Sequence, residues 1–185
     1  MKRTFIAVKI DAGDKLKGLI ATLMGELKSD RVRWVDTDHL HITLAFLGDT
    51  TGDAIKQIVT MLQTCCNDFG MVNFKVTGIG IFRNIADPRV IWAGLESVEK
   101  LAELFKIIKG GLNGIGISIE EREFKPHLTL GRVKWLKSRS ILERLIQQFS
   151  KTNFQEVSVS EVIFYESKLQ QAGPLYLPLD IARLN

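Results

Sequence analysis

Four stretches of the chain carry apolar residues at helical spacing. The first stretch repeats at intervals of three and four residues and forms one apolar stripe on a helix of about four turns; it consists of Leu16, Leu19, Ile20, Leu23, Met24 and Leu27. The same periodicity predicts helices within 55–66, 98–112 and 141–149.

Apolar runs and alternating patterns between these stretches are typical of strands. We expect strands at 4–10, 39–47, 72–82, 89–95, 126–134, 154–166 and 174–182. Helices and strands thus mix along the whole chain, which predicts the α/β (α+β) fold class.

Much of this pattern occurs twice. His41-Ile-Thr43-Leu44 recurs as His127-Leu-Thr129-Leu130, an offset of 86 residues, and the helical stripes align at nearly the same offset. We interpret the chain as a single bilobal domain of two pseudo-symmetric repeats, approximately 4–88 and 90–174, with a closing strand at 174–182. Equivalent positions of the two lobes are then expected to face each other across a cleft.

Composition and charge narrow the class of protein. The 185 residues are 45% hydrophobic and 25% charged, as in an ordinary globular protein. The formal net charge of +4 favours an anionic partner. Neither an apolar run of membrane-spanning length nor a signal peptide is visible, so we expect no membrane association and a cytoplasmic location.

The repeated motif puts polar side chains on one face of a strand. Alternation predicts that His41, Thr43 and Ala45 share a face, and that the opposite, apolar face carries Leu40, Ile42, Leu44 and Phe46. In the second copy, His127, Thr129 and Gly131 share a face in the same way. The cleft would therefore hold two imidazoles and two hydroxyls, with a small residue after each pair leaving room for a ligand.

These groups suit acid/base chemistry at a phosphate. One imidazole can remove a proton while the other delivers one at neutral pH. Two hydroxyls are neutral donors for phosphoryl oxygens. Because no Ser or Cys accompanies the histidines in a nucleophile motif, covalent catalysis is not indicated. Attack of water on a strained cyclic phosphodiester fits these parts.

The two motifs also carry a family resemblance. HITLAFLG at 41–48 and HLTLGRV at 127–133 resemble the paired motifs of the two-histidine (2H) phosphoesterase superfamily, specifically its RNA 2′,3′-cyclic phosphodiesterases, also called 2′-5′ RNA ligases. The resemblance extends over nearly the whole chain, through RTFIAVKI at 3–10, RWV at 33–35, IFRNIADPRVIWAGLE at 81–96, FKPHLTLGRVK at 124–134 and GPLYLPL at 173–179.

The resemblance implies a fold and a reaction. Two antiparallel sheets would line a central cleft, with helices on the outside. The implied reaction is metal-independent, cofactor-free hydrolysis of RNA 2′,3′-cyclic phosphate ends to 2′-phosphates, accompanied by reversible 2′-5′ RNA ligation. His41 would protonate the leaving O3′ and His127 would activate water, while Thr43 and Thr129 would hydrogen-bond the phosphate oxygens. RNA, including tRNA fragments, is the expected partner, and we expect a monomer.

Two further residues have two interpretations each. Arg132 stands where the family has a phosphate-binding cation, but strict strand alternation points it away from His127. A bulge would redirect it to the phosphate, and without one it would support the site from behind. Phe5 either stacks on the terminal base or packs in the core.

Basic residues near the cleft segments could follow the RNA backbone, namely Lys2, Arg3, Arg31, Arg33, Arg89, Lys125 and Lys134.

Two other classes of function compete with the phosphodiesterase. In the first, His39 and His41 form an H-x-H pair on one strand face, and His127 completes a three-histidine site of a metal-dependent hydrolase. In the second, the cleft captures RNA ends without catalysis. The first leaves the threonines unexplained, and the second leaves the pair of histidines unexplained.

Overall fold

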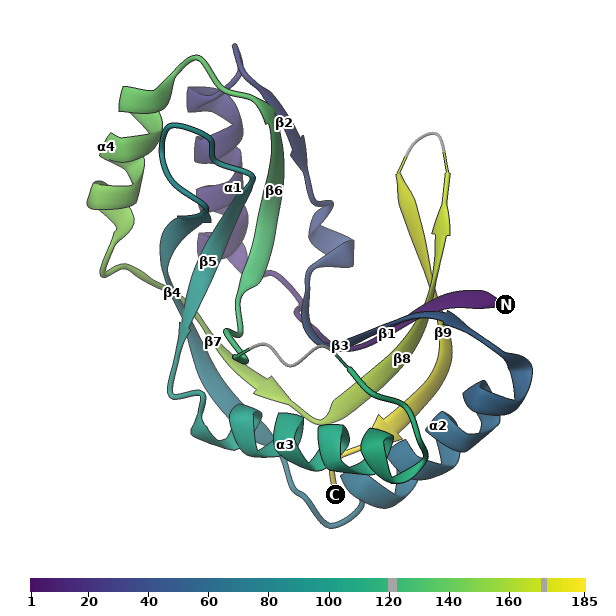
Figure 1. Cartoon of the computed structure of the whole chain (residues 1–185). Coiled ribbons are helices and arrows are strands. Elements are labelled where there is room, and N and C mark those ends of the chain that lie inside the picture. Colours follow the sequence, from purple (N-terminus) through teal and green to yellow (C-terminus); the bar gives the residue numbers. More distant parts are fainter. Residues whose placement is uncertain (120–122, 171–172) are drawn as a thin grey trace.

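The computed structural model describes residues 1–119, 123–170 and 173–185 and forms two lobes, each built on an antiparallel sheet (Figure 1). One sheet has the order β3-β1-β8-β9, with β1 at Lys2–Lys9, β3 at His41–Thr50, β8 at Glu161–Leu169 and β9 at Pro174–Arg183. The other has the order β2-β6-β5-β4-β7, with β2 at Arg31–Trp34, β4 at Val72–Phe82, β5 at Val90–Glu96, β6 at Leu128–Trp135 and β7 at Asn153–Val159. The predicted fold class is confirmed.

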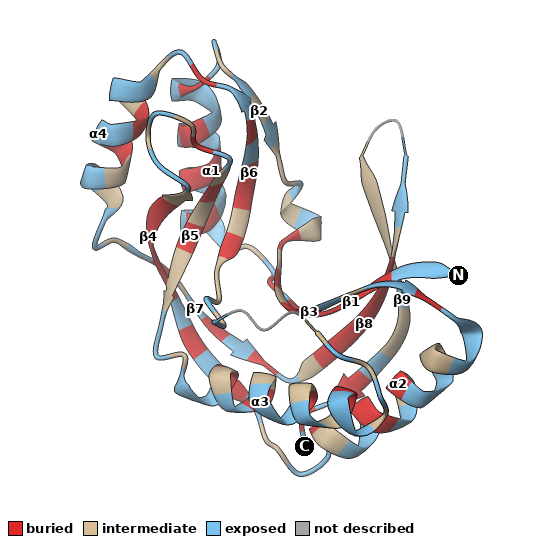
Figure 2. Ribbon diagram, viewed as in Figure 1, coloured by how far each residue is buried: buried red, intermediate tan, exposed pale blue. Residues whose placement is uncertain are grey.

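The helices lie on the outer faces of the two sheets (Figure 1). They are α1 (Asp14–Glu26), α2 (Gly52–Cys66), α3 (Glu99–Gly114) and α4 (Arg139–Phe149). Each turns a buried stripe inward while its other side stays in solvent (Figure 2). In α1 the buried residues belong to the stripe predicted from spacing, Leu16, Leu19, Ile20 and Leu23. Among the described helices, none is long and apolar enough to cross a membrane.

The two predicted repeats exchange their last strands between the two sheets. β4 lies between β5 and β7, whereas β8 lies between β1 and β9. The last strand of each predicted repeat therefore joins the sheet that the other repeat begins. At the offset of 86 residues, the order β3-β1-β8 in one sheet corresponds to the order β6-β5-β4 in the other. This correspondence supports the repeats at 4–88 and 90–174, which remain a prediction.

Several predicted strands differ from the structure, including the one expected from residue 126, which begins at Leu128. The single strand expected at 154–166 is two strands, β7 and β8, which separate at Ser160. The short edge strand β2 was not expected, because four residues are too few for a clear alternation. The strand expected from residue 39 begins at His41, since residues Thr37–His39 form a 3₁₀ turn, in which the Asp38 amide donates a hydrogen bond to the Asp36 side chain.

Both motif strands contain a bulge at the same place. In the β1–β3 pair, Ile6 faces Ala45 and Ala7 faces Thr43, so Leu44 is an extra residue. In the β5–β6 pair, the register likewise skips Leu130, which is 86 residues further along. A bulge shifts the alternation of side chains by one residue. Ala45 and Phe46 after the first bulge, and Gly131 and Arg132 after the second, therefore face opposite to the sequence-based expectation.

The core side of the first motif determines stability rather than chemistry. Ile42 is fully buried between the two cavity-facing residues His41 and Thr43. Ile42→Ala should lower the free energy of unfolding by about 2–5 kcal/mol, because it leaves a cavity in the core. Denaturant unfolding measures this change. The control Ile181→Ala, at an exposed position, should shift stability by no more than about 0.5 kcal/mol, and an equal loss in both variants would contradict the assignment.

Candidate active site

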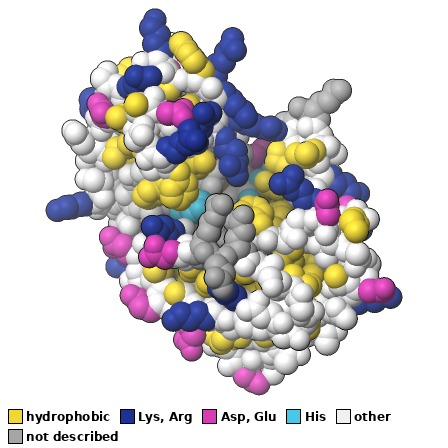
Figure 3. Space-filling view, in the orientation of Figure 1, with side chains coloured by type: hydrophobic (Ala, Val, Ile, Leu, Met, Phe, Trp, Pro, Cys, Tyr) yellow, Lys and Arg dark blue, Asp and Glu magenta, His cyan; other side chains and the backbone are white. Residues whose placement is uncertain are grey.

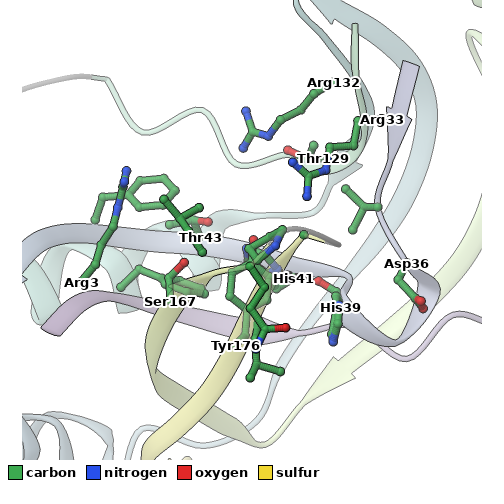
Figure 4. A pocket seen from close by; sticks show the side chains of 18 of the residues that line it. Arg3, Arg33, Asp36, His39, His41, Thr43, Thr129, Arg132, Ser167 and Tyr176 are labelled. Carbon is green, nitrogen blue, oxygen red and sulfur yellow. Dashed lines mark hydrogen bonds between the residues drawn. The ribbon is translucent and has the colours of Figure 1, made fainter. Parts of the chain in front are cut away.

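A cavity of about 650 Å³ lies between the lobes (Figure 4). Both sheets contribute to its wall, together with the β8–β9 hairpin and the 3₁₀ turn. The cavity brings together the six candidate site residues predicted from the motifs and the resemblance, namely Phe5, His41, Thr43, His127, Thr129 and Arg132. Residues 86 positions apart thus meet in one space. The basic residues expected near the cleft divide: Arg3 and Arg33 line the cavity, whereas Lys2, Arg31, Arg89, Lys125 and Lys134 do not.

The two motif histidines make the same backbone hydrogen bond. Nδ1 of His41 donates to the carbonyl oxygen of His39 at 2.7 Å, and Nδ1 of His127 donates to the carbonyl oxygen of Lys125 at 2.8 Å. Because a carbonyl only accepts, the proton of each neutral imidazole is fixed on Nδ1. Each Nε2 is left free to take up or release a proton.

The environment of His41 disfavours its protonated form. Burial is the main cause that lowers the pKa of His41 below its ordinary value of 6.5, and the positive charge of Arg132 and the other two histidines lower it further. The hydrogen bond to the His39 carbonyl acts in the opposite direction. His41 is therefore mainly neutral at pH 7.

Arg132 reaches the cavity because of the bulge at Leu130. Arg132 follows the extra residue and lies on the same face as Thr129, while Gly131 is turned into the protein. Figure 4 shows Thr129, Arg132 and Arg33 on one side of the cavity, opposite His41 and Thr43. Of the two interpretations of Arg132, the structure favours the one in which it faces the ligand.

Arg33 and Arg132 are direct cross-strand neighbours in the β2–β6 pair, and both line the cavity. Like charges opposite each other on a sheet destabilise it. Within the described residues neither guanidinium forms an ion pair. An anion between them would remove the repulsion, so this side of the cavity suits a phosphate. Lys and Arg side chains also lie on the surface around the hollow in which histidine atoms are visible (Figure 3).

The structure corrects the stacking interpretation of Phe5. The ring is only 3% exposed, is stacked on Tyr165 with centroids 5.1 Å apart, and lies 5.2 Å from the His41 ring. A ring covered in this way has no free face for a base. Phe5 instead belongs to a small apolar cluster with Ala7, Ile163 and Tyr165, against which the cavity residue Tyr176 packs.

Alternation alone also placed Ala45, Gly131 and Phe46 wrongly. Ala45 and Gly131 are buried rather than open to a ligand, and Phe46 lines the cavity rather than the core. The bulges are the reason. In the structure both residues of each pair, Leu44-Ala45 and Leu130-Gly131, are buried, which interrupts strict alternation.

Tyr176 is a cavity residue that motif analysis missed. Its ring meets the His41 ring edge-on, with centroids 5.2 Å apart, and meets His39 in the same manner at 5.7 Å. It therefore restricts how the His41 ring can turn. Only its position in the closing segment GPLYLPL, at 173–179, pointed to it.

The premise of the three-histidine site is wrong. His39 lies in the 3₁₀ turn and His41 begins β3, so the two do not share a strand face. Over residues 1–119, 123–170 and 173–185, no cluster of three or more His, Cys, Asp or Glu is arranged to hold a metal ion.

The contribution of Arg132 to the His41 pKa can be measured directly. We expect an NMR titration of the His41 ring to give a midpoint below 6.5, and Arg132→Gln to raise that midpoint because a like charge is removed. Arg139→Gln, on α4 and outside the cavity, is the control and should leave it unchanged. A midpoint that does not respond to Arg132→Gln would show that the two groups do not interact.

The sequence was compared with models of protein families and with known proteins. The family model of the 2′-5′ RNA ligase superfamily matches residues 16–171. A protein named RNA 2′,3′-cyclic phosphodiesterase from Methanothermobacter thermautotrophicus is 32% identical, over 98% of this chain and 98% of the relative. One with the same name from Thermotoga maritima is 34% identical, over 94% of this chain and 91% of the relative.

A solved structure gives the same result for the fold. The crystal structure of a Thermus thermophilus protein superposes with a TM-score of 0.79 at 24% identity and covers 98% of this chain and 97% of its own. The resemblance found in the sequence is thereby confirmed: the chain belongs to the 2′-5′ RNA ligase superfamily.

Proposed function

We propose that this protein hydrolyses RNA 2′,3′-cyclic phosphate ends to 2′-phosphates by acid/base catalysis with His41 and His127. One observation carries the proposal above all. Both imidazoles line one cavity, and both hold the Nδ1 proton on a backbone carbonyl, which leaves two Nε2 atoms for the reaction. The names of the relatives support the same reaction.

The proposed step is an in-line displacement at phosphorus. The oxygen of water bonds to phosphorus on one side, while the bond from phosphorus to O3′ breaks on the other. One imidazole takes the proton from water through Nε2, and the opposite imidazolium gives a proton to O3′. The phosphate remains on O2′. Both protons are thus accounted for without a metal ion.

The family resemblance assigns the proton for O3′ to His41 and the activation of water to His127. The lowered pKa of His41 means that it takes up its proton together with the anionic substrate, because the negative phosphate favours the imidazolium. Thr43 and Thr129 would donate hydrogen bonds to the phosphate oxygens, and Arg132 would supply a positive charge to them.

The substrate class follows from the charge of the cavity. Arg33 lies beside Arg132, and Arg3 lines the opposite side of the cavity near Thr43 and Ser167 (Figure 4); such side chains would follow an RNA backbone next to its cyclic end. Ends of tRNA fragments fall within this class. An RNA 5′-hydroxyl in place of water would give a 2′-5′ linkage by the same displacement. We further propose that the protein acts as a monomer, since the described residues of one chain line the cavity from both sheets, and that its location is cytoplasmic, as expected from the sequence.

The proposal is tested by a product assay. Wild-type protein should convert a short RNA ending in a 2′,3′-cyclic phosphate to the 2′-phosphate, and His41→Ala or His127→Ala should each lower the rate by about 10²-fold or more. Thr43→Ala or Thr129→Ala should have a smaller effect, since several groups contact the phosphate. Formation of the 3′-phosphate would contradict the leaving group, and binding without any product would support the non-catalytic RNA-end-binding module instead.

The metal-dependent alternative makes the opposite prediction in a second assay. Activity should survive a strong chelator. His39→Ala should change the rate by less than about threefold, because the His39 backbone carbonyl that accepts from His41 remains. Loss of activity with chelator, restored by added Zn²⁺, would instead favour the three-histidine hydrolase.

A further inference from the structure

Basic and aromatic side chains continue beyond the cavity along β2 and β6. β2 is the edge strand of its sheet and runs from the far end of the lobe down to the 3₁₀ turn at the cavity (Figure 1). Arg33 and Arg132, which face each other across β2 and β6, line the cavity. Two residues earlier in β2, Arg31 faces Trp135.

Arg31 and Trp135 lie on the same face of the sheet as Arg33. Side chains two residues apart in a strand share a face, and so do residues directly opposite each other in an antiparallel pair. Val32, between the two arginines, packs against the hydrophobic core instead. The pair of Arg31 and Trp135 therefore continues the wall of the cavity, about 7 Å further along the strands.

Trp135 is an aromatic ring that the fold leaves open. It is 51% exposed, whereas Trp34 and Trp92 are less exposed. Lys134, the extra residue of a bulge in β6, is exposed next to it. A ring stabilises a fold mainly through the area that it buries, so the open half of this ring is free for a ligand. We call Arg31, Lys134 and Trp135 the β2–β6 strip.

The positive charge of the β2–β6 strip is not compensated. Within the described residues neither Arg31 nor Lys134 forms an ion pair. The carboxylate of Asp30, next to Arg31 in the chain, accepts hydrogen bonds from the backbone amides of Lys137 and Ser138. Unpaired cations beside an open aromatic ring are the combination with which proteins bind single-stranded nucleic acid.

We propose that the β2–β6 strip binds the single-stranded RNA that precedes the cyclic phosphate end, with a base stacked on Trp135 and backbone phosphates at Arg31 and Lys134. This inference rests on the proposed function, since it requires the cyclic end to lie in the cavity. It adds that the substrate is an oligonucleotide held along one lobe. The strip adjoins the cavity wall at Arg33, so an RNA strand whose end occupies the cavity can extend onto it.

The chemistry of the strip favours RNA over a protein partner. A protein-binding patch would group further exposed apolar side chains around the ring, but the exposed neighbours of Trp135 across the strands and along the chain are Arg31 and Lys134. Solvated charge alone leaves the half-exposed tryptophan unexplained. RNA uses both features, because each nucleotide offers a negative phosphate and a flat base.

The experiment compares two substrates that share the reacting end. One is a nucleoside 2′,3′-cyclic phosphate, and the other is a pentanucleotide that ends in the same cyclic nucleotide. Trp135→Ala should raise KM for the pentanucleotide roughly tenfold, with kcat changed less than about threefold, because one stacked base is lost. The mononucleotide does not reach the strip, so its KM should be the same in Trp135→Ala and wild type. Trp135→Phe should restore most of the lost affinity for the pentanucleotide.

The phosphate contacts are tested by the dependence of KM on salt. Arg31→Gln and Lys134→Gln each remove one contact, so the slope of log KM for the pentanucleotide against log salt concentration should fall by about 0.7 in each variant. The matched controls are Lys106→Gln for charge and Ile107→Ala for apolar area. Both positions are exposed on α3 and lie outside the cavity, so the two controls should leave both substrates unaffected.

The outcomes separate this inference from the proposed function. If Trp135→Ala raises KM equally for both substrates, or for neither, the β2–β6 strip does not bind RNA while the phosphodiesterase activity stands. An unchanged salt slope in both Arg31→Gln and Lys134→Gln would contradict the phosphate contacts. If wild-type protein converts neither substrate, the proposed function itself fails. Denaturant unfolding identifies any misfolding of Trp135→Ala, in which case the salt slopes of the two Gln variants decide.

Discussion

The hydrogen bond from Nδ1 of each motif histidine to the carbonyl two residues earlier is the interaction on which the site depends. It fixes the tautomer of both rings at a point where the chain enters the strand from an irregular segment. Because the carbonyl belongs to the backbone, no side chain is needed to orient the ring, unlike in a triad with a carboxylate. The same arrangement in both lobes leaves Nε2 of each neutral imidazole unprotonated, as the two proton transfers proposed above require.

The paired bulges decide what surrounds these imidazoles. Without the extra residue at Leu130, Arg132 would point into the core, where an unpaired guanidinium is costly. Without the extra residue at Leu44, Phe46 would be buried and the cavity would lack its open aromatic end. One local irregularity, repeated 86 residues later, thus brings a cation to one side of the cleft and a phenyl ring to the other.

Charge and strand order work together around this space. Arg33 and Arg132 are held side by side by the register of an edge strand, so their repulsion is built into the sheet. The positive charge of Arg132 also lowers the pKa of His41. A bound anion would act in the opposite direction, because a negative charge favours the imidazolium. The exchange of β4 and β8 joins the two lobes through both sheets, which favours a fixed distance between the two walls of the cavity.

The sequence by itself determined the helices and most of the strands, because apolar periodicity is a property of neighbouring positions. The repeated His-x-Thr motif and its surroundings likewise determined the family and the six candidate residues that line the cavity. Only the tertiary structure decided which way Arg132, Phe46 and Ala45 face, because a bulge depends on the register with a partner strand distant in the chain. It also decided the burial of Phe5 against Tyr165 and the contact of Tyr176 with His41, since β8 and β9 come from the far end of the sequence. Contacts between residues so far apart in the chain leave no periodic pattern in the sequence, because only folding brings the two residues together.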